Sequence, residues 1–408
     1  MTTPKKTKSE TTAATKKTPA KAIAIPKKKA VAPAVTGIED LKEELMVARI
    51  TELEEDNLHL KDVNRELRDE NAKKTRESGI LRIMADELAK NPITSSLKPY
   101  TKTSKRGEGK IEESAVLLLS DLHGDQIIKA SRVSNVEEYN FDVFCKRMER
   151  LVDVTIDHLT ENMKSYSFKT LYVFSLGDLV SGEIHGSTEH TKWRNAIKNA
   201  VGVGEVIGMA LSDLSANFDK VIVCSVSGNH GRRSIRKNFR GAHDNWDYLV
   251  NIQAQNKCRQ HIEDGKIEFV TPDAWSMMVD VEGHTFHLSH GDDIKSFNGI
   301  PFYGMERKSR RLISIGAVTG KIPEYLCIGH YHVQMSMQTT NGEHLMSGSF
   351  PAADEFSYEQ LGAYSEPFQL LFGVHCRMGK TWSLPIRLRT DNWREDEKKP
   401  SRYKVTIV

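Results

Sequence analysis

The sequence predicts an α/β fold for its C-terminal part. Three apolar, β-branched runs have the composition of buried strands, at residues 116–119, 171–176 and 221–226. Two stretches with apolar residues at helical spacing lie between them, at residues 139–163 and 193–214. This alternation of strand and helix patterns predicts a β-α-β-α-β unit.

The remaining elements of this part follow in order. A helix is expected over 244–261, and the turn Glu282-Gly283 predicts a hairpin between two later strands. The expected strands are 267–271, 275–281, 284–289, 325–328, 344–347 and 369–376, and residues 403–408 are expected to add an edge strand. The whole segment 114–408 is interpreted as one domain.

The N-terminal segment has the composition of a disordered tail. Residues 1–36 hold nine lysines and a single acid, Glu10, among Thr, Ala and Pro. A segment with so little apolar surface cannot offset its ordering entropy. The basic charge would favour a nucleic-acid backbone, with an affinity that depends on salt.

Residues 37–90 are expected to be helical. A heptad frame fits the centre, with leucine at d and asparagine at three successive a positions: Ile50, Leu53, Asn57, Leu60, Asn64, Leu67 and Asn71. Asparagine at a fixes the register of a parallel two-stranded coiled coil, so we expect a homodimer through 38–74. The alternative is a solvated amphipathic helix. A second short helical pattern at 78–90 stops at Asn91-Pro92, and residues 91–113 are interpreted as a linker.

Five short polar islands follow strand-like runs in the domain. They are Asp121-Leu122-His123, Gly177-Asp178, Gly228-Asn229-His230, His290-Gly291-Asp292 and Gly329-His330-Tyr331-His332. Strand ends of an α/β sheet are where loops converge and a site can be assembled. Carboxylates and imidazoles together suit a pair of divalent cations, and imidazole favours Mn, Fe, Co and Zn over Mg or Ca. The glycines before Asp178, Asn229 and His330 permit close backbone approach.

These five islands, in this order, resemble the calcineurin-like metallophosphoesterases over roughly residues 114–408. The resemblance implies two mixed β-sheets sandwiched between helices. It also implies two metal ions, foremost Mn, with Fe, Zn or Ni as alternatives. The implied roles are a first metal at Asp121, His123 and His332, a bridge at Asp178, a second metal at Asn229, His290 and His330, and a catalytic imidazole at His230.

One position departs from the family pattern. The family has an acid after the histidine of the third island, whereas this chain has Gly231. Asp244 and Asp247 are candidates to orient His230 in its place. Arg232 is expected to clamp phosphate, because a guanidinium binds phosphate bidentately. The Gly-Asn-His-Gly-Arg form resembles phage- and prophage-encoded members related to repair exonucleases.

The sequence therefore predicts a metal-dependent phosphoesterase, foremost a nuclease that hydrolyses nucleic-acid phosphodiesters. The alternatives are a phosphatase acting on phosphoproteins or small nucleotides, and a non-catalytic assembly protein. No apolar run reaches the length of a membrane span, and five scattered cysteines without a CxxC pair fit a reducing compartment. We expect a cytoplasmic protein, in the host cytoplasm if it is phage-encoded.

Overall fold

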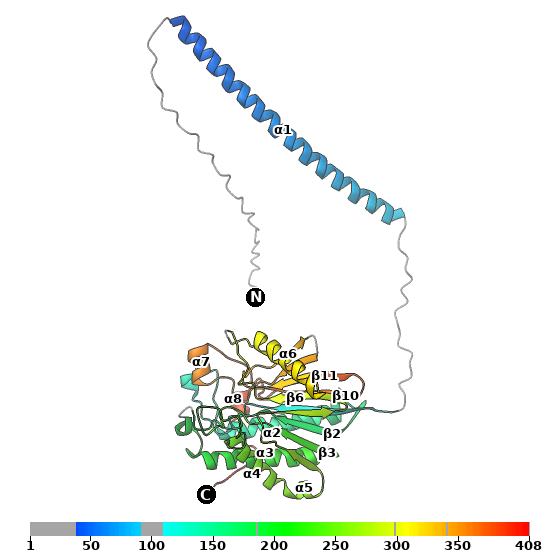
Figure 1. Cartoon of the computed structure of the whole chain (residues 1–408), viewed down its shortest axis with the longest axis vertical. Coiled ribbons are helices and arrows are strands. Elements are labelled where there is room, and N and C mark those ends of the chain that lie inside the picture. Colours follow the sequence, from blue (N-terminus) through cyan, green and yellow to red (C-terminus); the bar gives the residue numbers. More distant parts are fainter. Residues whose placement is uncertain (1–37, 91–108, 185–186, 298, 340–341, 408) are drawn as a thin grey trace, which may run out of the picture. The chain divides into compact units, whose positions relative to one another are not determined.

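The computed structural model describes residues 38–90, 109–184, 187–297, 299–339 and 342–407. The predicted tail at 1–36 and most of the predicted linker lie outside these residues. The described residues belong to two units, the helix α1 (Ile38–Lys90) and a C-terminal domain. α1 is one uninterrupted helix (Figure 1), so the expectation of a separate short helix at 78–90 is wrong: Ser78 and Gly79 lie within the helix.

The domain contains two β-sheets. Its strands are β1 (Ile111–Leu119), β2 (Tyr166–Ser175), β3 (Lys220–Ser225), β4 (Ile267–Val270), β5 (Ser276–Val281), β6 (His284–Ser289), β7 (Tyr325–Ile328), β8 (Met335–Thr339), β9 (Gly342–Met346), β10 (Phe368–His375) and β11 (Gly379–Arg387). The first sheet has the order β11-β10-β1-β2-β3-β4, and the second has the order β5-β6-β7-β9-β8. Both mix parallel and antiparallel pairs: β1 is parallel to β2 and antiparallel to β10, and β6 is parallel to β7 and antiparallel to β5.

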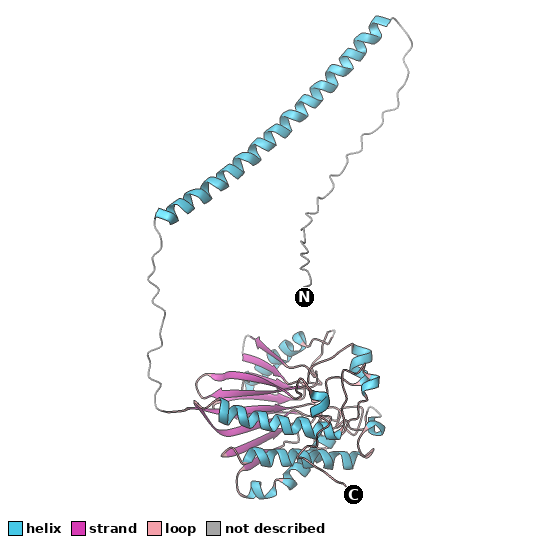
Figure 2. Ribbon diagram, turned by 180° about the vertical axis from the view of Figure 1, so that it is seen from behind, coloured by secondary structure: helices cyan, strands magenta, loops and turns pink. Residues whose placement is uncertain are grey.

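Helices cover the outer faces of both sheets. The helices of the domain are α2 (Phe141–Asp157), α3 (Ala196–Ser215), α4 (Trp246–Lys257), α5 (Arg259–Glu263), α6 (Phe302–Thr319), α7 (Glu355–Leu361) and α8 (Trp393–Asp396), with short turns at η1 (Ala130–Arg132), η2 (His158–Asn162) and η3 (Ser187–His190). Of these, α2, α3 and α4 pack on the first sheet and α6 packs on the second. Figure 2 shows the strands side by side with helices packed against them. The helices α2, α3 and α4 each begin after an asparagine whose side chain accepts backbone N–H groups of the first turn.

Alternation along the central strands builds two cores. Leu117 and Leu119 of β1 pack with residues of α2 and α3, whereas Val116 and Leu118 point the other way, into a core shared with the second sheet. A third cluster joins Met305 of α6 to the opposite face of the second sheet. The predicted fold class, two mixed sheets between helices, is confirmed. No described helix has the length and hydropathy of a membrane span.

Two local expectations differ from the structure. Residues 403–407 form no strand; instead the Tyr403 hydroxyl donates to Asp213 of α3 at 2.8 Å, which fixes this segment on a helix. β1 starts at Ile111, three residues before the expected domain start, and it contains the buried Glu113, which accepts from Trp382 Nε1 at 3.0 Å. Because an acid interrupts the apolar residues by which a buried strand is recognised, the sequence did not predict the start of β1.

Candidate metal centre

Both sheets contribute side chains to one site at the ends of their strands. The residues after β1, β2 and β3 of the first sheet are Asp121, His123, Asp178, Asn229 and His230; those after β6 and β7 of the second are His290, His330 and His332. The structure brings all of these predicted site residues together. Three overlapping groups have ligand atoms within 4.8 Å of one another: Asp121, His123 and His332; His123, Asp178 and His230; and Asp178, His290 and His330.

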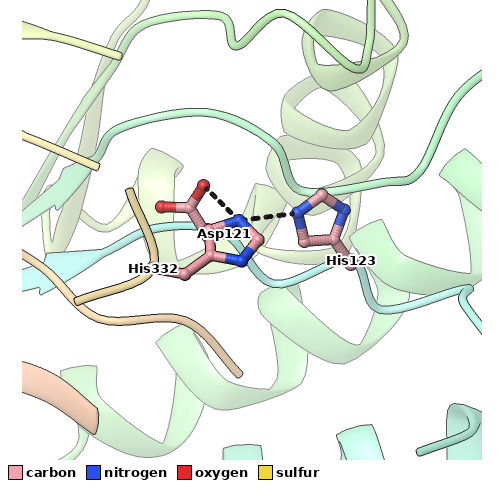
Figure 3. Close-up of side chains that lie close together, drawn as sticks. All are labelled: Asp121, His123 and His332. Carbon is pink, nitrogen blue, oxygen red and sulfur yellow. Dashed lines mark hydrogen bonds and ion pairs between the residues drawn. The ribbon is translucent and has the colours of Figure 1, made fainter. Parts of the chain in front are cut away.

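The first group surrounds the His332 ring. Its Nε2 lies 3.4 Å from His123 Nε2 and 3.3 Å from Asp121 Oδ1, as Figure 3 shows. His123 Nδ1 is buried and has no hydrogen-bond partner among the described residues. Imidazole nitrogens and a carboxylate oxygen that converge at this spacing form a cluster of electron-pair donors, which is the arrangement a cation stabilises.

The second group centres on the His290 ring. His290 Nε2 lies 2.9 Å from Asp178 Oδ2, 3.0 Å from Asn229 Oδ1 and 3.3 Å from His330 Nδ1. His290 Nδ1 faces the Leu176 carbonyl at 2.8 Å, which places a proton on Nδ1 and directs Nε2 toward Asp178 and Asn229. Asp178 contacts this group through Oδ2 and accepts the His230 backbone N–H through Oδ1 at 2.7 Å. Its carboxylate therefore lies between the two groups.

The charges of the site are set by burial and by these contacts. Burial, reinforced by His230 and His332, lowers the pKa of His123 to about 3, and burial likewise lowers the pKa of His330 to about 4. Burial opposes the charging of Asp178 as well, but neighbouring histidines outweigh it and hold its pKa well below the usual range. Two neutral imidazoles and an ionised carboxylate are the protonation states that metal ligation requires.

His290 and His332 differ from these two histidines. Burial disfavours the charged form of His290, but the Asp178 carboxylate outweighs burial and raises the pKa of His290 to about 10. Burial likewise opposes the charged form of His332, and Asp121 outweighs it and raises the pKa of His332. A metal ion at either group would have to displace a proton, so metal affinity should rise with pH. The donor set fits two divalent cations of the type that accepts imidazole.

The backbone of the site is strained. Nine non-glycine residues have positive φ in the described part of the chain, and five of them are predicted ligands: Asp121, His123, Asp178, His330 and His332. An L-residue in this left-handed region costs roughly 1 kcal/mol or more. Such outliers cluster at functional sites, where surrounding structure holds them in place.

Gly177 and Gly228 are required because the loops after β2 and β3 approach each other closely. A Cβ on Gly228 would lie 2.2 Å from Asp178 Oδ1, and a Cβ on Gly177 would lie 2.3 Å from the Gly228 nitrogen. Both distances are far inside van der Waals contact. The loops after β2 and β3 therefore pack backbone to backbone, which holds Asp178 against Asn229.

The acid missing after His230 has a structural explanation. A Cβ on Gly231 would lie 2.0 Å from Asn245 Oδ1 and 3.1 Å from Asp247 Cγ, so no acidic side chain fits there. Asp247 occupies part of this space. His230 Nδ1 lies 3.3 Å from the Ser181 carbonyl, and Asp244 is exposed and paired with Arg233 at 3.0 Å. A backbone carbonyl therefore contacts the His230 ring, and the role of an acid in orienting this ring stays a prediction.

Asp247 has a different role that the sequence did not reveal. Its carboxylate accepts the backbone N–H groups of Asp178 at 2.9 Å, Leu179 at 3.0 Å and Gly228 at 2.8 Å. It is fully buried at the first turn of α4. One side chain therefore fixes two metal-site loops, and its place two residues after the N-cap asparagine Asn245 was the local signal.

Asp121 is held in a similar way by residues absent from the predicted set. Ser120 Oγ donates to Asp121 Oδ2 at 2.5 Å, and Gln369 of β10 bonds both backbone groups of Ser120. Asp125 is buried next to Ser181, whose backbone N–H it accepts at 2.8 Å, and burial raises its pKa to about 6. These supports come from segments distant in sequence, so spacing alone could not identify them.

The predicted phosphate-binding residue lies at the rim of the site. Arg232 is half-buried, and its Nε donates to the Asn229 carbonyl at 3.0 Å. The other basic residues between 233 and 240 differ in their surroundings. Lys237 pairs with Asp292 at 2.8 Å, whereas Arg236 and Arg240 are exposed. On α6, Lys308 pairs with Asp293 at 2.7 Å. Part of the basic charge near the site is therefore neutralised locally.

Comparison with known proteins gives similar solved structures only. No family model and no curated protein matches the sequence. An archaeal phosphodiesterase is 9% identical, with 66% of this chain and 99% of that chain covered and a TM-score of 0.30. Vacuolar protein sorting 29 from Cryptosporidium parvum is 14% identical, with 67% and 96% covered and a TM-score of 0.31. YfcE, a phosphoesterase from E. coli, is 13% identical, with 67% and 100% covered and a TM-score of 0.28. Similarity at this level carries no argument about activity, which must be inferred from the site itself.

Proposed function

We propose that the domain is a metal-dependent phosphoesterase whose substrates are nucleic-acid phosphodiesters. The observation that carries the proposal is the pair of donor groups joined by Asp178, with His230 and Arg232 beside them. Asp121, His123 and His332 would hold one divalent cation, and Asn229, His290 and His330 the other, with Asp178 shared. Such a pair supplies charge neutralisation at the attacking and leaving oxygens of an in-line displacement.

His230 and Arg232 would act on the substrate directly. The Ser181 carbonyl lies 3.3 Å from His230 Nδ1 and fixes the ring, and Nε2 would give a proton to the leaving oxygen. Arg232 is anchored through Nε to the loop that carries Asn229 and His230, which leaves its planar guanidinium at the rim to contact a phosphoryl oxygen.

Two observations support a polymeric substrate. Arg236, Phe239 and Arg240 are exposed on the segment that directly follows His230, and Phe239 is 81% exposed. Cations track a phosphate backbone, and an exposed aromatic ring provides a stacking surface for a base. The lysines of residues 1–36 would add further backbone affinity.

The competing proposal is a phosphatase acting on small nucleotides or phosphoproteins. The local pairing of Lys237 with Asp292 and of Arg233 with Asp244 favours it, because paired cations contribute less to a polymer-binding surface. A third reading, a non-catalytic assembly protein, is supported only by the exposed apolar residues of α1.

A substrate panel with Mn²⁺ distinguishes these proposals. It should contain single- and double-stranded DNA, RNA, a generic phosphodiester and a generic phosphomonoester. Deletion of residues 1–36 should lower affinity for nucleic acid and flatten its salt dependence, while turnover of the small diester stays unchanged. Arg232→Ala should slow even the small diester. Hydrolysis of the monoester alone, with no salt-dependent binding to DNA or RNA, would replace the nuclease proposal by the phosphatase.

A further inference from the structure

The helix α1 exposes an apolar stripe that needs a partner. It has 53 residues, and every described residue from 42 to 90 is exposed apart from the half-buried Gly79. The stripe contains Met46, Leu53, Leu60, Leu67 and Leu81, which are between 50% and 69% exposed. Isolated helices derive little stability from propensity alone, and an apolar stripe on one is a surface for association.

The heptad frame defines the length of the seam. Counting in sevens from Ile50 places Asn57, Asn64 and Asn71 at a, and Leu53, Leu60 and Leu67 at d. The helix continues past this frame, but Lys74 at d and Ser78 at a interrupt the seam. The continuous seam therefore runs from Ile50 to Asn71.

The asparagines distinguish between possible orientations. In a parallel, in-register pair each asparagine faces its own copy and can hydrogen-bond to it. In an antiparallel pair the a positions face d positions, so Asn57, Asn64 and Asn71 would face apolar residues and be desolvated without a partner. The sequence of the seam thus favours two parallel copies.

The flanking charges provide an independent argument. In a parallel pair the residue at g contacts the residue at e of the next heptad in the partner. Arg49 then meets Glu54, and Asp56 meets Lys61. The two following contacts, Val63 with Arg68 and Glu70 with Thr75, are neutral. No like charges meet between residues 49 and 75, so the flanks of this window are complementary to those of a second copy.

We propose that α1 pairs with α1 of a second copy of this chain as a parallel, in-register coiled coil along the seam from Ile50 to Asn71. The partner is a second copy because the asparagine positions and the flanking charges both match their own sequence. The inference does not depend on the activity of the C-terminal domain.

Charge reversal tests the flanking contacts. Arg49 already pairs with Glu52 on its own helix at 2.6 Å, so Asp56 and Lys61 are the better pair to change. Lys61→Glu should weaken dimerisation of the full chain by on the order of tenfold, because it faces Asp56 of the partner. The double variant D56K/K61E should restore it. Residues five apart are not neighbours on one helix, so a solvated monomeric helix would show no such rescue.

Sedimentation equilibrium of the full chain measures both effects. All five tryptophans lie between residues 193 and 393, so their fluorescence melting curve checks that the C-terminal domain is unaltered in each variant. A monomeric wild-type chain would overturn the proposal. So would a dimer that Lys61→Glu leaves unchanged, or one that the double variant fails to restore.

Disulfide formation tests orientation and register. In a Cys376→Ser background, Leu53→Cys and Leu67→Cys are made separately, with Asp62→Cys on the outer face as the control. Both seam variants should form disulfide-linked dimers well above the control. The two positions are 14 residues apart, about 21 Å along a helix. One antiparallel arrangement cannot bring each into contact with its own copy, so cross-linking of only one, or of neither, would refute a parallel pair.

Discussion

Replacing Asp247 by asparagine should destabilise the domain and slow the proposed reaction together. The carboxylate accepts two backbone N–H groups at Oδ2, from Asp178 and Gly228, and one at Oδ1, from Leu179. An amide keeps at most the two bonds at the oxygen, and its NH₂ group then faces the Leu179 N–H. Two buried donors without acceptors cost about 1–3 kcal/mol each.

A compensating effect reduces this cost. Burial and the Asp178 charge raise the pKa of Asp247 to about 7, so a neutral amide removes some electrostatic repulsion. We therefore expect a net loss of about 2–4 kcal/mol in the free energy of unfolding. Because the Asp178 backbone loses its fixed position, kcat on a small phosphodiester should also fall at temperatures where the variant is folded.

Urea unfolding followed by tryptophan fluorescence measures the first effect, and steady-state kinetics with Mn²⁺ measures the second. Asp244→Asn is the matched control, because Asp244 is an exposed acid three residues away that pairs with Arg233. It should cost less than about 0.5 kcal/mol. If Asp247→Asn is as harmless as this control, the argument that one carboxylate fixes both loops is wrong.

Three other changes have separate expected outcomes. Asp178→Asn should remove bound metal and activity while the domain stays folded, as metal analysis and circular dichroism would show; retention of both metals would contradict the shared position. His230→Gln should leave metal content intact and slow turnover by roughly 10²–10⁴-fold, with a smaller loss for good leaving groups. Hydrogen bonds from Arg389, Arg387 and Tyr364 outweigh burial and lower the pKa of Glu366 to about 2, so its stabilisation is present above its ordinary pKa and is lost as pH falls toward 2. Glu366→Gln should therefore flatten the acid limb of the stability curve measured by thermal melting.

The sequence predicted the elements whose residues alternate or repeat locally. β6 and β7 have the bounds expected from their apolar runs, and the five polar islands lie at strand ends as their positions indicated. The strands β8 and β11 were not expected: β8 is largely half-exposed and polar, and β11 contains Pro385 and Lys380. Their strand state depends on pairing with β9 and β10, which the local pattern does not contain.

For the site as well, local sequence predicted some residues and could not predict others. Side chains that point into it come from short motifs and could be named in advance. The residues that hold them, such as Asp247 and Gln369, act across many positions of the chain. Gly231 is understandable only from the space that Asn245 and Asp247 fill, since no sequence spacing reveals that contact.

The left-handed backbone at five predicted ligands affects which substitutions the sequence would accept during evolution. Glycine at His123, His330 or His332 would relieve roughly 1 kcal/mol of backbone strain at each position. At Asp121 and Asp178 the side chains also accept backbone N–H groups, so glycine there would lose those bonds. Selection for folding alone would therefore not favour the three histidines. In a library screened only for abundance, these positions should drift toward glycine, whereas a library screened for turnover should keep them. The difference between the two screens would measure how much stability the chain forgoes to keep its metal site.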